Sequence, residues 1–462
     1  MKRFAVLFIA ALMLFLTACG GGNNNSNSGG NTAAGSNSGS NNAGKSEEVV
    51  TIRTSITAGE LSEEQIAEFE AAHPNINVEI EELDDTKLAA QLATNSAPDI
   101  IRINGVFDLP SYVIRGIAMD LTEYIENSEL IDMEDLHPIV DVYRFDGKTV
   151  GEGPIYGLPK DWSNDFAIFY NKRAFDRAGV EVPDPSEPLT WPEVMELAKK
   201  LTIVGEDGKV VQYGLAANEW GRTEPNFNNM MQYLLSAGVN ISNEDFTEIN
   251  VDNQAVRDYL AMWVDAVKSN VGPNLLNNDQ TSGGDLFLSD RAAMIINGYW
   301  YSGVIRGNAD AQTHLEDFGM LPTPIAPGGE RVAPSGSATG AIINKNTKHP
   351  EEAWTFFEWF FAGKPAEDRA STGWGLPIFN SLMEKLPQET EFDKQVYNVL
   401  QDELQYTDYL GVNPYLSDAG WGIFEKYAQQ LYFDEITIDE AIEGMNKDLN
   451  VAVTEAYNAI NQ

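Results

Sequence analysis

Apolar positions along the chain follow two spacings, one typical of strands and one typical of helices. Residues 49–52 form a β-branched run, and apolar residues alternate with polar ones over 76–80, so both segments are predicted strands. Between them, residues 62–65 (SEEQ) have the pattern of a capping box that opens a helix, and Pro74 stops that helix. A strand, a helix and a second strand in this order predict a βαβ unit with parallel strands.

The same alternation continues through the rest of the chain. Residues 87–95 predict a helix and residues 98–101 a strand, which makes a second round of the unit. Later segments with helical spacing are 190–201, 253–268 and 350–361, and a further strand is predicted at 340–343. The expected fold class is therefore α/β.

The first residues have the features of an export signal. Lys2 and Arg3 precede an apolar run over residues 4–16, and small residues then lead to Cys19, the only cysteine of the 462 residues. The run is shorter than the roughly 20 residues that a membrane-spanning helix needs. An ordinary signal peptide with a chance cysteine is the alternative. We expect residues 1–19 to be a lipoprotein signal peptide, with Cys19 as the lipobox cysteine that is lipidated with diacylglycerol and palmitate.

A low-complexity segment follows the signal. Residues 20–46 consist almost entirely of Gly, Asn, Ser, Ala and Thr, so we expect a disordered tether. Residues 39–46 match a phosphate-loop pattern, but no apolar strand precedes them, and we reject nucleotide binding. The expected location is the outer face of the cell membrane, lipid-anchored on the extracellular side or in the periplasm.

Length and charge limit the function classes. About 415 residues follow the tether, which is more than one ordinary core holds, so two or more domains are expected. The chain has 30 basic and 70 acidic residues, and its net charge of −40 argues against nucleic acid or anionic membrane surfaces as partners. A single cysteine excludes an intramolecular disulfide.

Several short segments, taken in order, resemble a known family. The chain from about Val49 to its C-terminus resembles extracellular solute-binding protein family 1, the sugar-binding lipoprotein receptors of bacterial ABC importers, of the maltodextrin-binding type. The segments that carry the resemblance are residues 73–78 (HPNINV), 97–100 (APDI), 169–172 (FYNK) with Phe175 and Gly179, 189–191 (LTW), 287–291 (FLSDR), 292–294 (AAM), 297–300 (NGYW) and 349–354 (HPEEAW).

The resemblance implies a type II periplasmic-binding-protein fold, in which two hinged α/β lobes hold the ligand in a cleft between them. Hinges are expected near Pro159, Asp317 and Phe361. Lobe 1 would comprise residues 47–159 plus 317–361, and lobe 2 residues 160–316 plus 362–462. The implied receptor closes on a mono- or oligosaccharide and delivers it to ABC permease subunits. It would be a monomer without catalysis or a cofactor.

The nine tryptophans point independently to carbohydrate, because sugars present C–H faces that pack on flat aromatic rings. Four of them lie in amphipathic segments and are expected in the core: Trp191, Trp263, Trp354 and Trp359. The other five adjoin glycine or polar residues and are candidates for the cleft, namely Trp162, Trp220, Trp300, Trp374 and Trp421. The alternative for each is that it only packs a loop against its own lobe.

Polar candidates complete the expected site. Trp300 ranks first among all candidates, because the resemblance implies that its Gly-x-Trp turn presents a stacking ring. Candidates from the first lobe lie after predicted strands, where ligands of α/β sheets bind. The polar candidates are Glu60, Asn104 and Asp108 from the first lobe, Asp161, Asn226 and Asn228 from the second, and, ranked lower, Ser335 with Ser337.

Two other functions are weighed against the receptor. A secreted, lipid-anchored glycoside hydrolase would use two carboxylates that sequence cannot identify, but no Gly-x-Ser-x-Gly or His-Glu-x-x-His motif is present. The four histidines suggest structural or surface roles, and no metal site is expected. A cell-wall adhesion protein would have repeats, which are absent. The sugar stays open, and uronates are favoured if Arg222 or Arg331 faces the cleft.

Overall fold

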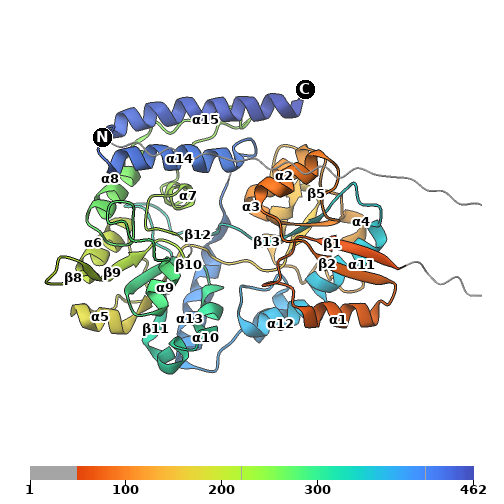
Figure 1. Cartoon of the computed structure of the whole chain (residues 1–462), viewed down its shortest axis with the longest axis horizontal. Coiled ribbons are helices and arrows are strands. Elements are labelled where there is room, and N and C mark those ends of the chain that lie inside the picture. The colour runs from red at the N-terminus through yellow and green to blue at the C-terminus, as the bar shows by residue number, and fades with distance from the viewer. Residues whose placement is uncertain (1–48, 220, 412, 462) are drawn as a thin grey trace, which may run out of the picture. The chain divides into compact units, whose positions relative to one another are not determined.

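The computed structural model describes residues 49–219, 221–411 and 413–461, which form alternating strands and helices around two five-stranded sheets (Figure 1). The α/β class expected from the alternation is confirmed. The expected signal with Cys19, the tether and Trp220 lie outside the described residues.

The first sheet has the strand order β2-β1-β3-β13-β6. Strands β1, β2 and β3 are parallel, with Ile52 opposite Val78, and this confirms the predicted βαβ units. Strand β13 runs antiparallel to both β3 and β6. The bounds are β1 (Val50–Thr54), β2 (Ile76–Ile80), β3 (Ile100–Asn104), β6 (Gly157–Pro159) and β13 (Thr339–Ile343).

The second sheet has the order β11-β7-β10-β9-β8. Strands β9 and β10 are parallel, and the other neighbours are antiparallel. All six residues of β10 are buried, so this strand lies in the interior. The bounds are β7 (Ala167–Asn171), β8 (Ile203–Val204), β9 (Val210–Ala216), β10 (Ala292–Asn297) and β11 (Phe318–Leu321).

Helices surround both sheets (Figure 1). Those beside the first sheet are α1 (Glu63–Ala72), α2 (Asp85–Ala93), α3 (Gly105–Ile114), α4 (Thr122–Glu126), α11 (Pro350–Ala362) and α12 (Lys364–Thr372). Those beside the second are α5 (Lys172–Ala178), α6 (Trp191–Leu201), α7 (Phe227–Ser236), α8 (Gln254–Lys268), α9 (Gly283–Leu288), α10 (Tyr301–Gly307), α13 (Glu391–Glu403), α14 (Ser417–Tyr432) and α15 (Ile438–Asn461).

Shorter elements connect these parts. Two small sheets pair β4 (Arg144–Phe145) with β5 (Val150–Ile155), and β12 (Ala333–Ser335) with β14 (Thr407–Tyr409). The 3₁₀ helices are η1 (Pro138–Tyr143), η2 (Ala311–Asp317), η3 (Asn380–Lys385) and η4 (Leu404–Tyr406).

Side-chain caps fix where the predicted helices begin. Ser62 and Gln65 form the capping box of α1, as the sequence predicts. Thr190 and Glu193 form another at α6. Asn253 caps α8 by accepting a hydrogen bond from a backbone N–H of the first turn. These caps satisfy N–H groups that the helices leave free, so the local sequence favours these first residues.

The chain passes between the two sheets more than once. It first passes from β6 to β7 between Pro159 and Ala167. The crossing expected near Pro159 lies at the start of this segment. It returns later than the expected point near Asp317, because β11 is still an edge strand of the second sheet. The return therefore falls between Leu321 and β13.

The last crossing also lies later than expected. Helix α12 and the loop after it stay with the first sheet, since Phe379 forms a bridge with Leu136. Helix α13 belongs to the second, because the Gln395 side chain bonds both the N–H and the carbonyl of Met320 on β11. The crossing thus lies between Phe379 and α13, after Phe361.

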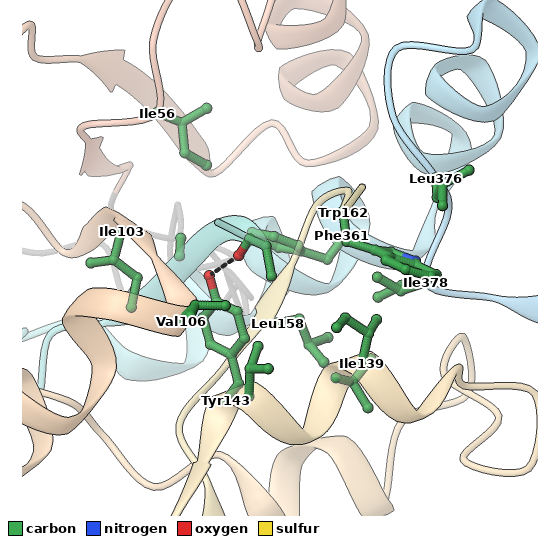
Figure 2. Packing of buried hydrophobic residues seen from close by; sticks show 14 of the residues in the cluster. Ile56, Ile103, Val106, Ile139, Tyr143, Leu158, Trp162, Phe361, Leu376 and Ile378 are labelled. Atoms are coloured by element: carbon green, nitrogen blue, oxygen red, sulfur yellow. Dashed lines mark hydrogen bonds between the residues drawn. The ribbon is translucent and has the colours of Figure 1, made fainter. Parts of the chain in front are cut away.

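Large aromatic side chains fill the core. Trp191 and Trp263 are fully buried, Trp354 is almost so, and Trp359 packs half-buried against the core, which agrees with their prediction as core residues. Tyr143, on η1, is fully buried, and its hydroxyl donates to the carbonyl of Ala338 at 3.0 Å. Figure 2 shows this interior packing near the first crossing.

Candidate ligand-binding site

A cavity of about 870 Å³ lies among loops that follow strands of both sheets. Strands β1, β3, β9 and β10 all end at it, as expected for a ligand site at the carboxyl ends of parallel strands. Its volume falls in the upper part of the range of about 300–1,000 Å³ that small-molecule sites have. Nine of the twelve predicted ligand contacts line it: Glu60, Asn104, Asp161, Trp162, Asn226, Asn228, Trp300, Trp374 and Trp421.

Ion pairs form the wall on the side of the first sheet. Arg102 of β3 donates to Glu60 in a two-pronged arrangement, with Nε–Oε2 at 2.6 Å and Nη2–Oε1 at 3.0 Å. Lys160 Nζ lies 3.3 Å from Glu60 Oε1 and also pairs with Asp161. The three side chains Glu60, Lys160 and Asp161 are at most 14% exposed. The wall is therefore polar and held in place.

These contacts determine the charge of Glu60. Burial alone would raise its pKa, but the charges of Lys160 and Arg102 and the hydrogen bonds they donate outweigh burial and lower the pKa to about 2. For Asp161 burial prevails, so its pKa is raised although Lys160 lowers it in part. The polar atoms of this wall can accept and donate hydrogen bonds to a ligand without a change of protonation at Glu60.

Asp165 lines the cavity farther along the first crossing. One of its oxygens, Oδ2, accepts from the N–H of Gly336 at 2.8 Å and from both the N–H and the hydroxyl of Ser337 at 3.1 Å. Burial raises the pKa of Asp165 to about 7, with these hydrogen bonds acting in the opposite direction. The residue joins two segments of chain that cross between the sheets.

Asparagines form the polar wall on the side of the second sheet. Asn226 caps α7 by accepting from the N–H of Asn229 at 2.8 Å. Asn228 Oδ1, Asn229 Nδ2 and Asn297 Nδ2 are buried, and none has a hydrogen-bond partner among the described residues. Buried amide atoms without a partner are costly, and the three residues that carry them line the cavity.

Aromatic rings line the cavity in two groups. The ring centroids of Trp300 and Trp374 lie 6.2 Å apart, and Trp374 is 41% exposed. Trp421 on α14 meets Phe107 on α3 edge-on, with 5.8 Å between their centroids. The cavity thus offers flat apolar surfaces beside hydrogen-bonding groups.

Trp162 lines the cavity but has a structural environment. Its side chain is 1% exposed, and its ring stacks on His137 with 4.4 Å between centroids. Its Nε1–H donates to the carbonyl of Pro377 at 3.1 Å, and in Figure 2 it lies beside Leu376 and Ile378. The ring thus connects the first crossing segment to the segment that leads to the last crossing. The ring face that stacks on His137 is covered.

Two predicted contacts are not on the cavity wall, and a third is not described. Asp108 accepts from the N–H of Asn104 at 2.7 Å in the first turn of α3, where it supports a lining residue. Ser335 is fully buried in β12, which pairs with β14. Trp220 lies outside the described residues.

Several lining residues were not predicted from the sequence. Arg102 lies in β3 and Asn297 in β10. A polar residue within such a buried strand is a sequence signal from which a cavity-lining position can be predicted. Lys160 and Asp165 lie close in sequence to the predicted Asp161 and Trp162, whereas Ser337, a lower-ranked candidate of the sequence analysis, does line the cavity. Nothing in the local sequence distinguishes Phe107 from an ordinary apolar residue of a helix.

Other kinds of site find little support in residues 49–461. No group of three or more His, Cys, Asp and Glu side chains within the described ranges is arranged to hold a metal ion. No described helix combines the length and apolar character that crossing a bilayer requires. His137, which precedes Pro138, accepts from the N–H of Ile139 at 3.1 Å and has a structural role.

Comparisons with known proteins bear on this cavity. The family model described as "Bacterial extracellular solute-binding protein" matches residues 54–364. An uncharacterized lipoprotein in the oleD 5′ region of Streptomyces antibioticus is 25% identical over 330 residues, which cover 68% of this chain and 66% of that protein. The match thus spans just under two thirds of the relative's length.

Solved structures share the fold. The ABC substrate-binding protein Lmo0181 from Listeria monocytogenes, in complex with cycloalternan, has a TM-score of 0.71 at 23% identity, covering 87% of this chain and 98% of that chain. A solute-binding protein of an ABC transporter from Thermotoga lettingae, bound with α-D-tagatose, has a TM-score of 0.69 at 19% identity, covering 88% and 99%. These likenesses confirm the expected two-lobed α/β fold.

Proposed function

Because the chain belongs to the bacterial extracellular solute-binding protein family and is a substrate-binding protein, we propose that its solute is a mono- or oligosaccharide, which it delivers to the permease of an ABC importer. The single observation that carries the choice of sugar is the pair of indoles, Trp300 and Trp374, beside unpartnered amides in one cavity. Sugars have apolar C–H faces and hydroxyl edges, and this wall matches both.

The cavity favours an oligosaccharide over a single ring. Its volume of about 870 Å³ exceeds what one hexose fills. The wall carries two ring pairs, Trp300 with Trp374 and Phe107 with Trp421. A ligand of several rings can use both.

Closure of two lobes is the proposed mode of capture. Lobe 1 carries the first sheet and lobe 2 the second, and the chain connects them at residues 160–166, 322–338 and 380–390. Phe107 and Trp421 come from helices of different lobes and touch at the cavity. A ligand that contacts both walls stabilises the closed form by its differential affinity for it.

The proposed location is the outer face of the cell membrane. The support is the sequence of residues 1–19, with Cys19 as the lipidated residue, followed by a tether over 20–46. The Streptomyces antibioticus relative is itself named a lipoprotein. We propose that the receptor works as a monomer held there by its lipid.

Hydrolysis of the sugar is the competing function, since three carboxylates line the cavity. Glu60 is ion-paired, with its pKa at about 2, and so does not donate a proton near neutral pH. Asp165 is occupied by three donors of the neighbouring crossing segment. We propose that the ligand is released unchanged.

Isothermal titration calorimetry tests the proposal, with a panel of mono- and oligosaccharides and an assay for new reducing ends in the same samples. Saturable heat without product supports a receptor. Turnover of any sugar in the panel supports a hydrolase instead, and the absence of saturable heat across the panel contradicts sugar binding.

A further inference from the structure

The cavity wall carries both cationic and anionic side chains. Among the described lining residues, the cationic side chains are Arg102 and Lys160, and the carboxylates are Glu60, Asp161 and Asp165. A further cation, Arg369, lies behind this wall in a small adjoining cavity that Lys160 and Asp161 also line. Two cations therefore lie among three carboxylates on the cavity wall, so the wall has no excess of positive charge.

Each lining cation already has an anionic partner. Glu60 takes both prongs of the Arg102 guanidinium, at 2.6 and 3.0 Å, and lies 3.3 Å from Lys160 Nζ. Lys160 pairs with Asp161 as well. The Lys160 side chain is 6% exposed and that of Glu60 is 11% exposed, so neither can turn away to meet a ligand without breaking a buried pair.

Arginines outside the cavity wall do not provide an unpaired cation for an anionic ligand. Arg222 pairs with Glu224 at 3.2 Å, and Arg331 pairs with Glu403 at 3.0 Å. Neither is among the lining residues, so the condition under which uronates were favoured is not met. The net charge of −40 adds a long-range repulsion of anions.

We propose that Glu60 determines charge specificity: by neutralising Arg102 and Lys160 it restricts the cavity to uncharged sugars and rejects uronates and sugar phosphates. This inference rests on the proposed function and concerns which sugars are accepted. An anionic sugar would find no free cation and would have to displace Glu60 from a bidentate pair. A neutral sugar can instead hydrogen-bond to the outer atoms of the same pairs, which keep their geometry.

Two matched probes test the inference on the full chain. One is the neutral oligosaccharide that binds best in the panel, and the other is the same sugar with its primary hydroxyls oxidised to carboxylates. We expect wild type to bind the oxidised sugar at least about 100-fold more weakly, because a desolvated charge without a partner costs several kcal/mol. Equal affinity for both sugars would overturn the inference while leaving sugar binding intact, whereas binding of neither would overturn both proposals.

Variants separate the role of Glu60 from a general charge effect. Glu60→Gln leaves Arg102 without a carboxylate partner and Lys160 with Asp161 alone, and we expect it to improve the affinity for the oxidised sugar relative to the neutral one at least about 10-fold. Arg102→Met leaves Glu60 with a weaker partner set, and we expect it to discriminate against the oxidised sugar at least as strongly as wild type. Glu126→Gln on α4 removes a carboxylate from the exposed surface and is the matched control, expected to leave the ratio unchanged.

Salt distinguishes local pairing from the field of the whole protein. At about 0.5 M salt the long-range repulsion is screened, but the buried pairs are not, so discrimination in wild type should persist. Its disappearance would overturn the assignment to Glu60. Circular dichroism and thermal unfolding identify a variant that fails to fold, and the reverse change in Arg102→Met and the salt series in wild type then still decide the inference.

Discussion

Asp165 accepts two hydrogen bonds from Ser337, one from its backbone N–H and one from its hydroxyl, both at 3.1 Å. Asp165 lies in the segment that leads from β6 to β7, and Ser337 lies in the segment between β12 and β13. The contact therefore ties two of the crossings between the sheets to each other. In the lobe closure proposed above, these crossings are the segments that would bend, and this carboxylate links two of them.

Replacing Asp165 with Asn removes a titrating carboxyl but keeps an oxygen that accepts the same hydrogen bonds. The pKa of Asp165 is about 7, raised by burial from an ordinary value of 3.8. Between those values the folded protein holds a proton that the unfolded chain releases, so this group lowers the free energy of unfolding as the pH rises from about 4 to about 7. We expect the variant to lack that loss and to gain about 1–3 kcal/mol over wild type across this window.

Denaturant unfolding at a series of pH values measures this difference. Asp310→Asn, at an exposed position on the surface, is the control and should follow wild type at every pH. Asp165→Ala leaves three donors without their acceptor and should be destabilised by about 1–3 kcal/mol. A constant offset between wild type and Asp165→Asn from pH 4 to 7 would refute the assigned pKa.

Truncation of the indole pair should weaken sugar binding without unfolding the protein. Trp374→Ala removes a side chain that is 41% exposed, so we expect little change in stability and a loss of about 1–3 kcal/mol in binding. Trp300→Ala should lose at least as much. Phe433→Ala removes an exposed aromatic ring that does not line the cavity and serves as control. Unchanged affinity in both tryptophan variants, with intact folds, would remove these rings from the site.

Trp162 should show the opposite behaviour, because its ring is covered. Trp162→Phe loses the hydrogen bond to Pro377 and part of the buried surface, so we expect a loss of about 1–3 kcal/mol in the free energy of unfolding. The affinity for sugar should change less than in Trp374→Ala. Thermal unfolding and calorimetry on one preparation compare the two effects, and a large loss of affinity at unchanged stability would show that the ring meets the ligand.

Gly298 is required by a close approach beside Trp300. A Cβ at this position would lie 2.5 Å from Asp165 Oδ1 and 2.5 Å from Ser163 Oγ, and Ser163 accepts from the Trp300 N–H at 3.3 Å. Gly298→Ala should therefore displace that turn, costing about 1–3 kcal/mol in stability and weakening sugar binding. Gly307→Ala is the control, since no atom lies within 4 Å of its Cβ. Equal stability and affinity in the two variants would disprove the steric requirement.

Periodicity predicts the elements of this fold well because each one carries its own start and stop signals. The helix predicted over 253–268 is found as α8 (Gln254–Lys268), and that over 350–361 as α11 (Pro350–Ala362). The crossings are less well predicted. Strand β11 joins the second sheet by pairing with β7, some 150 residues earlier in the chain, and no local pattern encodes such a partner.

The candidate site is predictable only in part, because local sequence identifies some lining residues but not the contacts between distant segments. Trp374 and Trp421 are exposed and line the cavity, as glycine-flanked rings suggest. Trp162 has a similar polar neighbourhood in sequence but is covered by His137, which lies 25 residues earlier in the chain. The pairing of Glu60 with Arg102 joins a loop to a strand, so only the folded chain reveals that the cations of the wall are already paired.

A crystal structure with the best-binding sugar of the calorimetric panel tests the central claim most directly. We expect the sugar, chemically intact, in the cavity between the two sheets, with a ring packed on Trp300 or Trp374 and hydroxyls bonded to the Glu60–Asp161 wall and to Asn228, Asn229 or Asn297. A sugar bound elsewhere, a cleaved sugar, or a cavity left empty at saturating ligand would contradict the account.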